Sequence, residues 1–382
     1  MPTTDSESIV SQINSNVFFK EFTFSKNNFK APDTNKKLEF ADNVVWLDDL
    51  LFIYQIKERE PNSKKDSKRW FNRKVLKKAT EQIKSTLSYI SSYPEIFIEN
   101  EKGDKLDIKK ATPCNDIKKI IIYAPLDNFP ESQRYIKFYE SSEIGLVHLF
   151  HVEDYFLICK YLITPAEIKE YLDFRERQFH SDKEKSNTYS EQHSLERFLE
   201  ALDTDYSSII HADNLTNYES DININELDIS HFIKIFRERI TSPTNYETEY
   251  YPIVKEIAKL NRNELIEFKK RMLLTKERVK SQEADSPYRM YVPRTNCAFI
   301  FMMSPSSKSE HRENALHNNT TYHEYDCKPK KCIGVLIYRE KDHLEYFEAR
   351  WLYSEPKWQY NEEIEETLRN RSPLRKMEIK IR

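Results

Sequence analysis

The chain has 382 residues, and its 60 Lys and Arg nearly balance its 63 Asp and Glu, which leaves a formal net charge of −3. With 32% charged and 13% aromatic residues it has the composition of a folded protein, with room for two domains. Its three isolated glycines exclude a P-loop and a G-x-G-x-x-G nucleotide-binding motif, and the absence of a long apolar run or signal peptide predicts a cytoplasmic protein that has no membrane partner.

The N-terminal region predicts a helix, a strand and then a hairpin. Residues 5–14 fit a short helix with Thr4 or Asp5 as its N-cap, and the Phe-rich run 17–24 predicts a first strand. In the hairpin, two apolar strands flank Asp48-Asp49. If these two residues form the turn, cross-strand pairing puts Asp42 directly opposite Gln55.

Three polar residues converge on one face of this hairpin. Lys57 lies two residues beyond Gln55 and therefore points to the same side of the strand, close to Asp42. Polar groups on a face otherwise suited to burial need a reason. Carboxylate and amide oxygens are hard ligands that suit Mg²⁺, and a neighbouring ammonium stabilises negative charge that develops on a phosphate. The pattern predicts metal-dependent phosphodiester chemistry.

These residues resemble the PD-(D/E)xK restriction-endonuclease-like superfamily, in the Mrr-like variant whose second half reads QxK. The resemblance implies that Asp42 and Gln55 bind Mg²⁺, or Mn²⁺ as a substitute, and that Lys57 positions or activates the attacking water. It also implies an endonuclease of bacterial restriction or antiphage defence that hydrolyses DNA. The resemblance further implies that another domain or a partner protein governs activation, and the expected partners besides DNA are a second copy of the chain, as a homo-oligomer, or a protein of the defence system. Because Gln55 is neutral, we expect weaker metal binding than a glutamate would give.

A further acid is expected in the metal site, and the sequence leaves three candidates open. Glu7 lies on the first predicted helix, Glu21 in the first predicted strand, and Glu39 three residues before Asp42. In an ideal hairpin register Glu39 faces the opposite side, so it would need a β-bulge to join Asp42.

A basic helix follows the hairpin. Apolar residues at spacings of three and four predict an amphipathic helix over 67–90, and residues 57–84 contain eleven Lys and Arg against four acids. Its first half predicts a DNA-binding surface, because cations contact the phosphate backbone. The residues concerned are Lys68, Arg69, Arg73, Lys74, Lys77 and Lys78.

Three other interpretations stay open. A basic run is also typical of a solvated helix face. The nuclease fold could be catalytically inactive and serve to bind nucleic acid or to assemble a complex. RNA as the substrate shares the same site and is not separated from DNA by the sequence.

The remaining elements complete the expected organisation. Short apolar runs at 120–124 and 145–152 predict buried strands, and Thr164-Pro165-Ala166-Glu167 predicts a helix start. We expect an α/β fold with a restriction-endonuclease-like αβββαβ core and a mixed central sheet in residues 1–180. A polar linker is expected at 181–193, and an α+β domain of open role at 194–382.

The C-terminal region predicts helices within 251–282 and strands at 297–303, 332–338 and 344–351. It also contains a His- and Cys-rich run between residues 311 and 332 that could bind zinc. The spacings in this run are irregular, unlike the closely spaced pairs of structural zinc sites. Its members are His311, His317, His323, Cys327 and Cys332.

Overall fold

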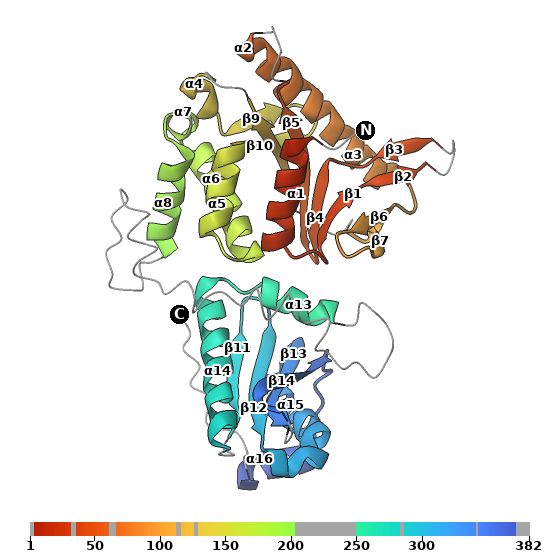
Figure 1. The fold of residues 1–382 in the computed structure, drawn as a ribbon, viewed down its shortest axis with the longest axis vertical. Helices are drawn as coiled ribbons and strands as arrows, with labels where there is room; N and C mark the ends of the chain where they lie inside the picture. The colour runs from red at the N-terminus through yellow and green to blue at the C-terminus, as the bar shows by residue number, and fades with distance from the viewer. Residues whose placement is uncertain are drawn as a thin grey trace. The chain divides into compact units, whose positions relative to one another are not determined.

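The computed structural model describes residues 4–31, 36–60, 66–111, 116–125, 129–202, 250–282, 286–340 and 343–371. The chain forms two compact units, Met1–Ile222 and Asn223–Arg382. Each unit contains its own main sheet with helices around it, so the protein is α/β with a mixed central sheet and a second sheet (Figure 1).

Eight strands form the sheet of the first unit, in the order β7-β6-β1-β4-β5-β8-β10-β9. The central pairs β5-β8 and β8-β10 are parallel, and the other pairs are antiparallel. The strands are β1 Thr23–Lys26, β4 Asn43–Leu47, β5 Leu50–Glu58, β6 Phe97–Asn100, β7 Lys105–Asp107, β8 Ile117–Ala124, β9 Phe138–Ser141 and β10 Gly145–His151. A separate two-stranded sheet pairs β2 Asn28–Lys30 with β3 Lys37–Glu39.

The predicted hairpin register is confirmed. Leu47 pairs with Leu50 across the Asp48-Asp49 turn, and Asn43 pairs with Tyr54. Asp48 takes a positive φ of 57°, which lets the chain reverse over two residues. The next position outward on each strand holds Asp42 and Gln55.

Helices cover both faces of this sheet. Alternate residues of β5 point to opposite sides, so Leu51 and Ile53 pack in a core with the helix α3. Phe52 and Tyr54 contact Phe18 and Tyr155 on the other side, with ring centroids 5.4 and 5.8 Å apart. The helices are α1 Asp5–Val17, α2 Ser67–Trp70, η1 Phe71–Lys78, α3 Ala79–Ser92, η2 Ile108–Ala111, α4 Glu131–Arg134, α5 Val152–Tyr161, α6 Pro165–Ser181, α7 Lys183–Ser186 and α8 Glu191–Leu202.

The first helix begins as predicted but runs further. The Thr4 hydroxyl accepts the Glu7 amide, and the Glu7 carboxylate accepts the Thr4 amide, which forms a capping box. α1 then extends to Val17, and the Phe18 amide still bonds Asn14. The expected strand over 17–24 was therefore wrong in its first half, since the chain turns at Phe19 and β1 begins later.

The long helix predicted over 67–90 is confirmed as one continuous run made of α2, η1 and α3. Its middle part, η1, is a π-helix, and the Ala79 amide still bonds the Lys74 carbonyl five residues earlier. In a π-helix, residues four and five apart lie on one side. Much of the basic run belongs to this segment.

The segment 181–193, predicted as a linker, lies inside the first unit. It contains α7 and the first residues of α8. The side chain of Glu191 is only 4% exposed, and it accepts hydrogen bonds from Tyr171 and Arg175 of α6. This buried pairing ties the segment to α6, although its composition is polar.

The second unit has a four-stranded sheet in the order β11-β12-β13-β14, with β12 and β13 parallel. The predicted strands and helices of this region are confirmed within a few residues, whereas residues 203–249 of the expected second domain lie outside the described residues. The elements are α13 Tyr251–Ala258, α14 Arg262–Ser281, β11 Tyr288–Val292, β12 Cys297–Ser304, η4 Ser306–His311, α15 Arg312–Cys327, β13 Lys331–Glu340, β14 His343–Ser354 and α16 Glu362–Arg371.

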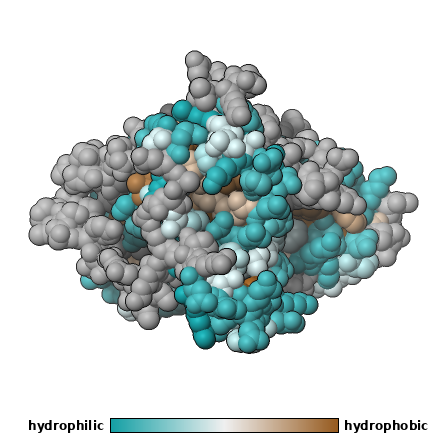
Figure 2. Space-filling model, turned by 90° about the horizontal axis from the view of Figure 1, so that it is seen from below, coloured by the Kyte–Doolittle hydropathy of each residue, from teal (hydrophilic) through white to brown (hydrophobic). Residues whose placement is uncertain are grey.

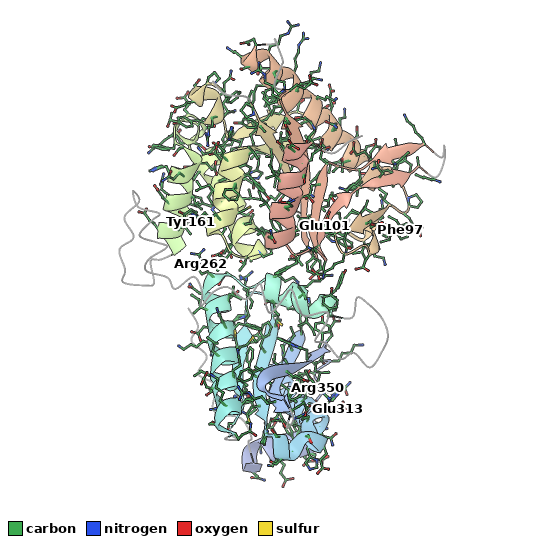
Figure 3. The ribbon with its side chains drawn as sticks, in the orientation of Figure 1. Phe97, Glu101, Tyr161, Arg262, Glu313 and Arg350 are labelled. Carbon is green, nitrogen blue, oxygen red and sulfur yellow. The ribbon has the colours of Figure 1, made fainter. Side chains whose placement is uncertain are left out.

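Helix α15 packs closely on β13. A Cβ atom at Gly334 would overlap the hydroxyl of Thr320 and a methyl of Leu316, so glycine is required there. At the sheet edge, Arg350 of β14 and Glu313 of α15 form a 2.8 Å ion pair (Figure 3).

The described surface is mainly polar on the face shown in Figure 2, where apolar side chains form only small areas. In the second unit, the large exposed apolar side chains among the described residues are Leu273, Leu274, Trp358 and Tyr360. None of the described helices combines the length and the apolar character needed to cross a membrane.

Candidate active site

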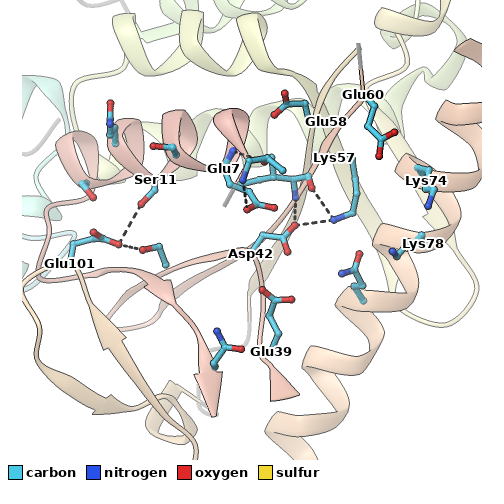
Figure 4. Close-up of a pocket in the computed structure, with 18 of the residues that line it drawn as sticks. Glu7, Ser11, Glu39, Asp42, Lys57, Glu58, Glu60, Lys74, Lys78 and Glu101 are labelled. Carbon is cyan, nitrogen blue, oxygen red and sulfur yellow. Dashed lines mark hydrogen bonds and ion pairs between the residues drawn. The ribbon is translucent and has the colours of Figure 1, made fainter. Parts of the chain in front are cut away.

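A cavity of about 1240 Å³ opens in the first unit where β4 begins and β5 ends. One wall is the polar side of α1, and the opposite wall is the long basic helix (Figure 4). Asp42, Ile56 and Lys57 lie between these two walls. The cavity therefore gathers residues from both sides of the sheet at the end of one hairpin.

The structure brings the three predicted hairpin residues together. Lys57 Nζ donates to Asp42 Oδ2 at 2.9 Å and to Gln55 Oε1 at 3.1 Å. The backbone supplies two further contacts, because Ile56 N donates to Asp42 Oδ2 at 2.6 Å and Ile56 O accepts from Lys57 Nζ at 2.9 Å. Gln55 and Lys57 lie two and four residues after Ile53 on β5, so they point to the same face as Ile53, which α3 covers.

These groups are largely withdrawn from solvent. The side chains of Asp42 and Lys57 are 6% and 13% exposed, and Gln55 is 2% exposed. A carboxylate in such a place needs a cation and hydrogen-bond donors. In the structure, Lys57 and the Ile56 amide provide them.

Two of the three candidate acids line the same cavity. Burial raises the pKa of Glu7, and repulsion from Asp42 raises it further, while the Thr4 amide opposes the shift. Burial likewise raises the pKa of Glu39, with added repulsion from Asp42 and Glu7. Glu21 is not among the residues that line the cavity, and it pairs instead with Lys102 at 3.5 Å.

The expectation that Glu39 faces away from Asp42 was wrong. It assumed that the hairpin strand continues back through Glu39, but β4 begins only at Asn43. Glu39 belongs to β3, which pairs with β2 in a separate sheet. The chain bends between the two strands, so Glu39 reaches the cavity without a β-bulge (Figure 4).

Glu39→Gln is expected to raise the melting temperature at neutral pH only slightly, by roughly 1 °C or less, because Glu39 is an exposed residue and water screens its charge. The raised pKa means that the folded state disfavours the charged carboxylate, so this cost appears as pH rises above the ordinary value of 4.5 and is absent below it. Thermal unfolding of wild type and variant at several pH values measures the difference. Glu81→Gln, at an exposed position of α3, is the control, and an equal gain in both variants would contradict the prediction.

Four of the six predicted DNA-contacting residues line the basic wall of the cavity, namely Arg69, Arg73, Lys74 and Lys78. Arg73 and Lys74 follow Arg69 by four and five residues, and Lys78 follows Lys74 by four, spacings that the π-helical turn of η1 brings toward one side. Lys74 and Lys78 face Lys57 across the cavity in Figure 4. Lys68 and Lys77 are exposed on the same helix but are not among the residues that line the cavity. Within the described parts of the chain, none of the six forms an ion pair.

Several residues that line the cavity belong to no recognisable sequence motif. Glu58 accepts the Ser6 amide at 2.9 Å at the start of α1. Ser8, Ser11 and Ser15 line the wall that α1 forms, at spacings of three and four. That spacing was the available signal, but it describes a polar helix face without indicating what the face meets.

The oxygens that meet at the hairpin suit a hard divalent ion, although Asp42 is the one charged ligand among them. No group of three or more His, Cys, Asp and Glu side chains is arranged to hold a metal ion in the part of the chain that the structure describes. At the hairpin, however, three oxygens meet one cationic nitrogen: Asp42 Oδ2, Gln55 Oε1 and Ile56 O. Carboxylate, amide and carbonyl oxygens are the ligands that Mg²⁺ takes, with water completing its shell.

The His- and Cys-rich run in the second unit does not form such a group within the described residues. It lies mainly on η4 and α15, with Cys332 on β13. His323 is buried, and its Nδ1 lies 3.3 Å from Cys327 Sγ, whereas the side chain of His311 is 65% exposed. Burial lowers the pKa of His323 to about 4, which suits a neutral imidazole in a core.

Comparisons with protein-family models, with curated proteins and with solved structures found no match for this chain.

Proposed function

We propose that the first unit is a Mg²⁺-dependent nuclease that hydrolyses phosphodiester bonds of DNA. The observation that carries the proposal is the meeting of Asp42, Gln55 and Lys57 at a cavity that Asp42 and Lys57 line, with Gln55 buried behind them. The opposite wall carries Arg and Lys side chains that form no ion pair with any described residue. Such a wall suits a polyanion, and such a hairpin suits chemistry at a phosphate.

The order of the elements also supports this proposal. If the short strands β2, β3, β6 and β7 and the turn η2 are set aside as insertions, the chain contains a helix (α1), three strands (β1, β4 and β5), the long helix and a strand (β8) that is parallel to β5. This order is compatible with the αβββαβ core of the restriction-endonuclease-like proteins that the D…QxK pattern resembles. A role in restriction or antiphage defence rests on that resemblance.

Each residue has a defined part in the proposed chemistry. Asp42, Gln55 and the Ile56 carbonyl would hold Mg²⁺, which when bound supplies a Lewis acid for the phosphate. Lys57 would donate hydrogen bonds to the negative charge that develops on the phosphate oxygens and orient the attacking water. Arg69, Arg73, Lys74 and Lys78 would hold the flanking phosphates and thereby align the strand.

The test measures nicking of supercoiled plasmid by purified protein with Mg²⁺ or Mn²⁺, and with chelator. We expect wild type to nick the plasmid only with metal, and Asp42→Ala to be inactive because a charged ligand is lost. Equal nicking by both proteins would contradict the assignment. Matched DNA and RNA duplexes, assayed in parallel, separate the two substrate classes.

A second candidate function is a catalytically inactive module that binds nucleic acid or assembles a complex. One observation favours it: Lys57 already satisfies both proposed side-chain ligands. This module would bind DNA without divalent metal and would keep its affinity in Asp42→Ala. Binding that depends strongly on metal would argue against it.

Both functions predict that the cavity side of the long helix contacts the phosphate backbone. In Lys74→Gln/Lys78→Gln, the slope of log affinity against log salt should become shallower by roughly 1.8, because two phosphate contacts are lost. Lys68→Gln/Lys77→Gln removes the same charge from the same helix outside the cavity, and we expect a much smaller change. Fluorescence anisotropy of a labelled duplex in chelator measures both slopes. Equal changes would mean that the helix attracts DNA only through its overall charge.

A further inference from the structure

The ammonium of Lys57 is bound as a cation by the oxygens proposed to bind metal. An ammonium has three hydrogens to donate, and Lys57 Nζ has three oxygen acceptors within 3.1 Å. They are one oxygen each from Asp42, Gln55 and Ile56. The nitrogen is therefore fully coordinated by the hard oxygens that a divalent ion would need.

Alternative partners for these oxygens are few. Asp42 Oδ2 has one other donor, the Ile56 amide at 2.6 Å, and the Asp42 side chain is only 6% exposed. Gln55 is more deeply buried still, at 2% exposed. A small divalent ion and the ammonium cannot occupy one set of oxygens together, because two cations at that distance repel strongly.

We propose that Lys57 competes with the divalent ion for these three oxygens and must leave them before metal binds. This inference rests on the proposed function, since it concerns the same metal site. The lysine side chain is a flexible four-carbon stem, so the ammonium can turn into the cavity that it already lines. The apparent metal affinity is then lowered by the fraction of molecules in which Lys57 holds the oxygens.

The experiment measures Mn²⁺ binding by the electron paramagnetic resonance signal of free Mn²⁺, on the full chain without nucleic acid. We expect Lys57→Met to bind Mn²⁺ at least roughly tenfold more tightly than wild type. Lys57→Arg keeps a cation at the site and should bind as weakly as wild type. Asp42→Asn should abolish binding in both the wild-type and the Lys57→Met background.

A matched control separates competition from a general loss of positive charge. Lys102 forms a comparable ion pair with Glu21, with 22% and 7% of the two side chains exposed, and it does not line the cavity. Lys102→Met should leave Mn²⁺ affinity near the wild-type value. Circular dichroism identifies any variant that fails to fold, and Lys57→Arg then still tests the inference through its retained charge.

Two results would overturn the inference, and they differ. If Lys57→Met and wild type bind Mn²⁺ equally, with binding that Asp42→Asn abolishes, the competition is wrong while the metal site stands. If no Mn²⁺ binding depends on Asp42 in any folded variant, the metal site itself is wrong, and the proposed function fails with it.

Discussion

Lys57→Met is expected to slow Mg²⁺-dependent nicking of DNA by a factor of roughly 10² to 10³. The side chain is only 13% exposed and lines the cavity, so water cannot simply replace it as a positioned donor to the phosphate. Methionine keeps a similar length and removes the charge. Single-turnover nicking at saturating Mg²⁺ measures the chemical step, because differences in metal affinity no longer contribute under those conditions.

We expect Lys57→Met to bind Mn²⁺ more tightly than wild type and to nick DNA more slowly, so metal affinity and nicking rate should change in opposite directions. A lysine with only a structural role would not produce that combination, since its loss would lower both. Lys102→Met serves again as the control and should nick at the wild-type rate. Nicking by Lys57→Met within a few-fold of wild type would remove Lys57 from the proposed chemistry.

The hairpin could be predicted from the sequence because its determinants are local. Alternation along a strand has a period of two, and the Asp48-Asp49 turn sets which residues face each other. Once these two are known, the positions of Asp42 and Gln55 follow. The close contact of Lys57 with both agrees with that reasoning.

Glu39 shows where local reasoning stops. Its position depends on β3 pairing with the neighbouring strand β2 and on the chain bending before β4 begins at Asn43. The cross-strand arithmetic assumes one straight strand through Glu39 and contains neither feature. The sequence thus predicted a straight strand where the chain bends, and this error placed the Glu39 carboxylate on the side away from the cavity.

The basic helix was predicted, but the side that faces the cavity was not. A spacing of three and four assumes a regular α-helix, whereas η1 is π-helical and groups residues four and five apart. Arg73, Lys74 and Lys78 line the cavity, whereas Lys77 does not. A π-helical segment is held by surrounding packing, here Phe71 and Val75 in the core, and has no simple sequence signature.

The polar segment after α6 was predicted as a linker because its polar residues outnumber apolar ones. Composition cannot show that a charge is buried against a partner. Arg175, whose side chain is fully buried, donates to Glu191 Oε2 at 2.9 Å, and its guanidinium lies 3.8 Å from the ring centre of Phe150. Burial lowers the pKa of His148 to about 4, so its neutral ring accepts from Arg175 and donates to Glu176.

Arg175→Met is expected to lower the free energy of unfolding of the first unit by about 3 to 5 kcal/mol. The substitution leaves the carboxylate of Glu191 buried without its cation, which costs more than the loss of the hydrogen bonds alone. Urea denaturation, followed by circular dichroism, measures the change. If α8 depends on this pair to dock on α6, the variant should also open the 191–202 region to proteolysis.

The double variant Arg175→Met/Glu191→Met identifies the cause of that loss. Because it removes the unpaired charge as well as the cation, it should be more stable than Arg175→Met alone, although one residue more has been changed. Lys183→Met breaks an exposed ion pair with Glu140 in the same region and should cost less than about 1 kcal/mol. If the double variant were less stable than the single one, packing of the side chains, and not the buried charge, would hold α8 to the first unit.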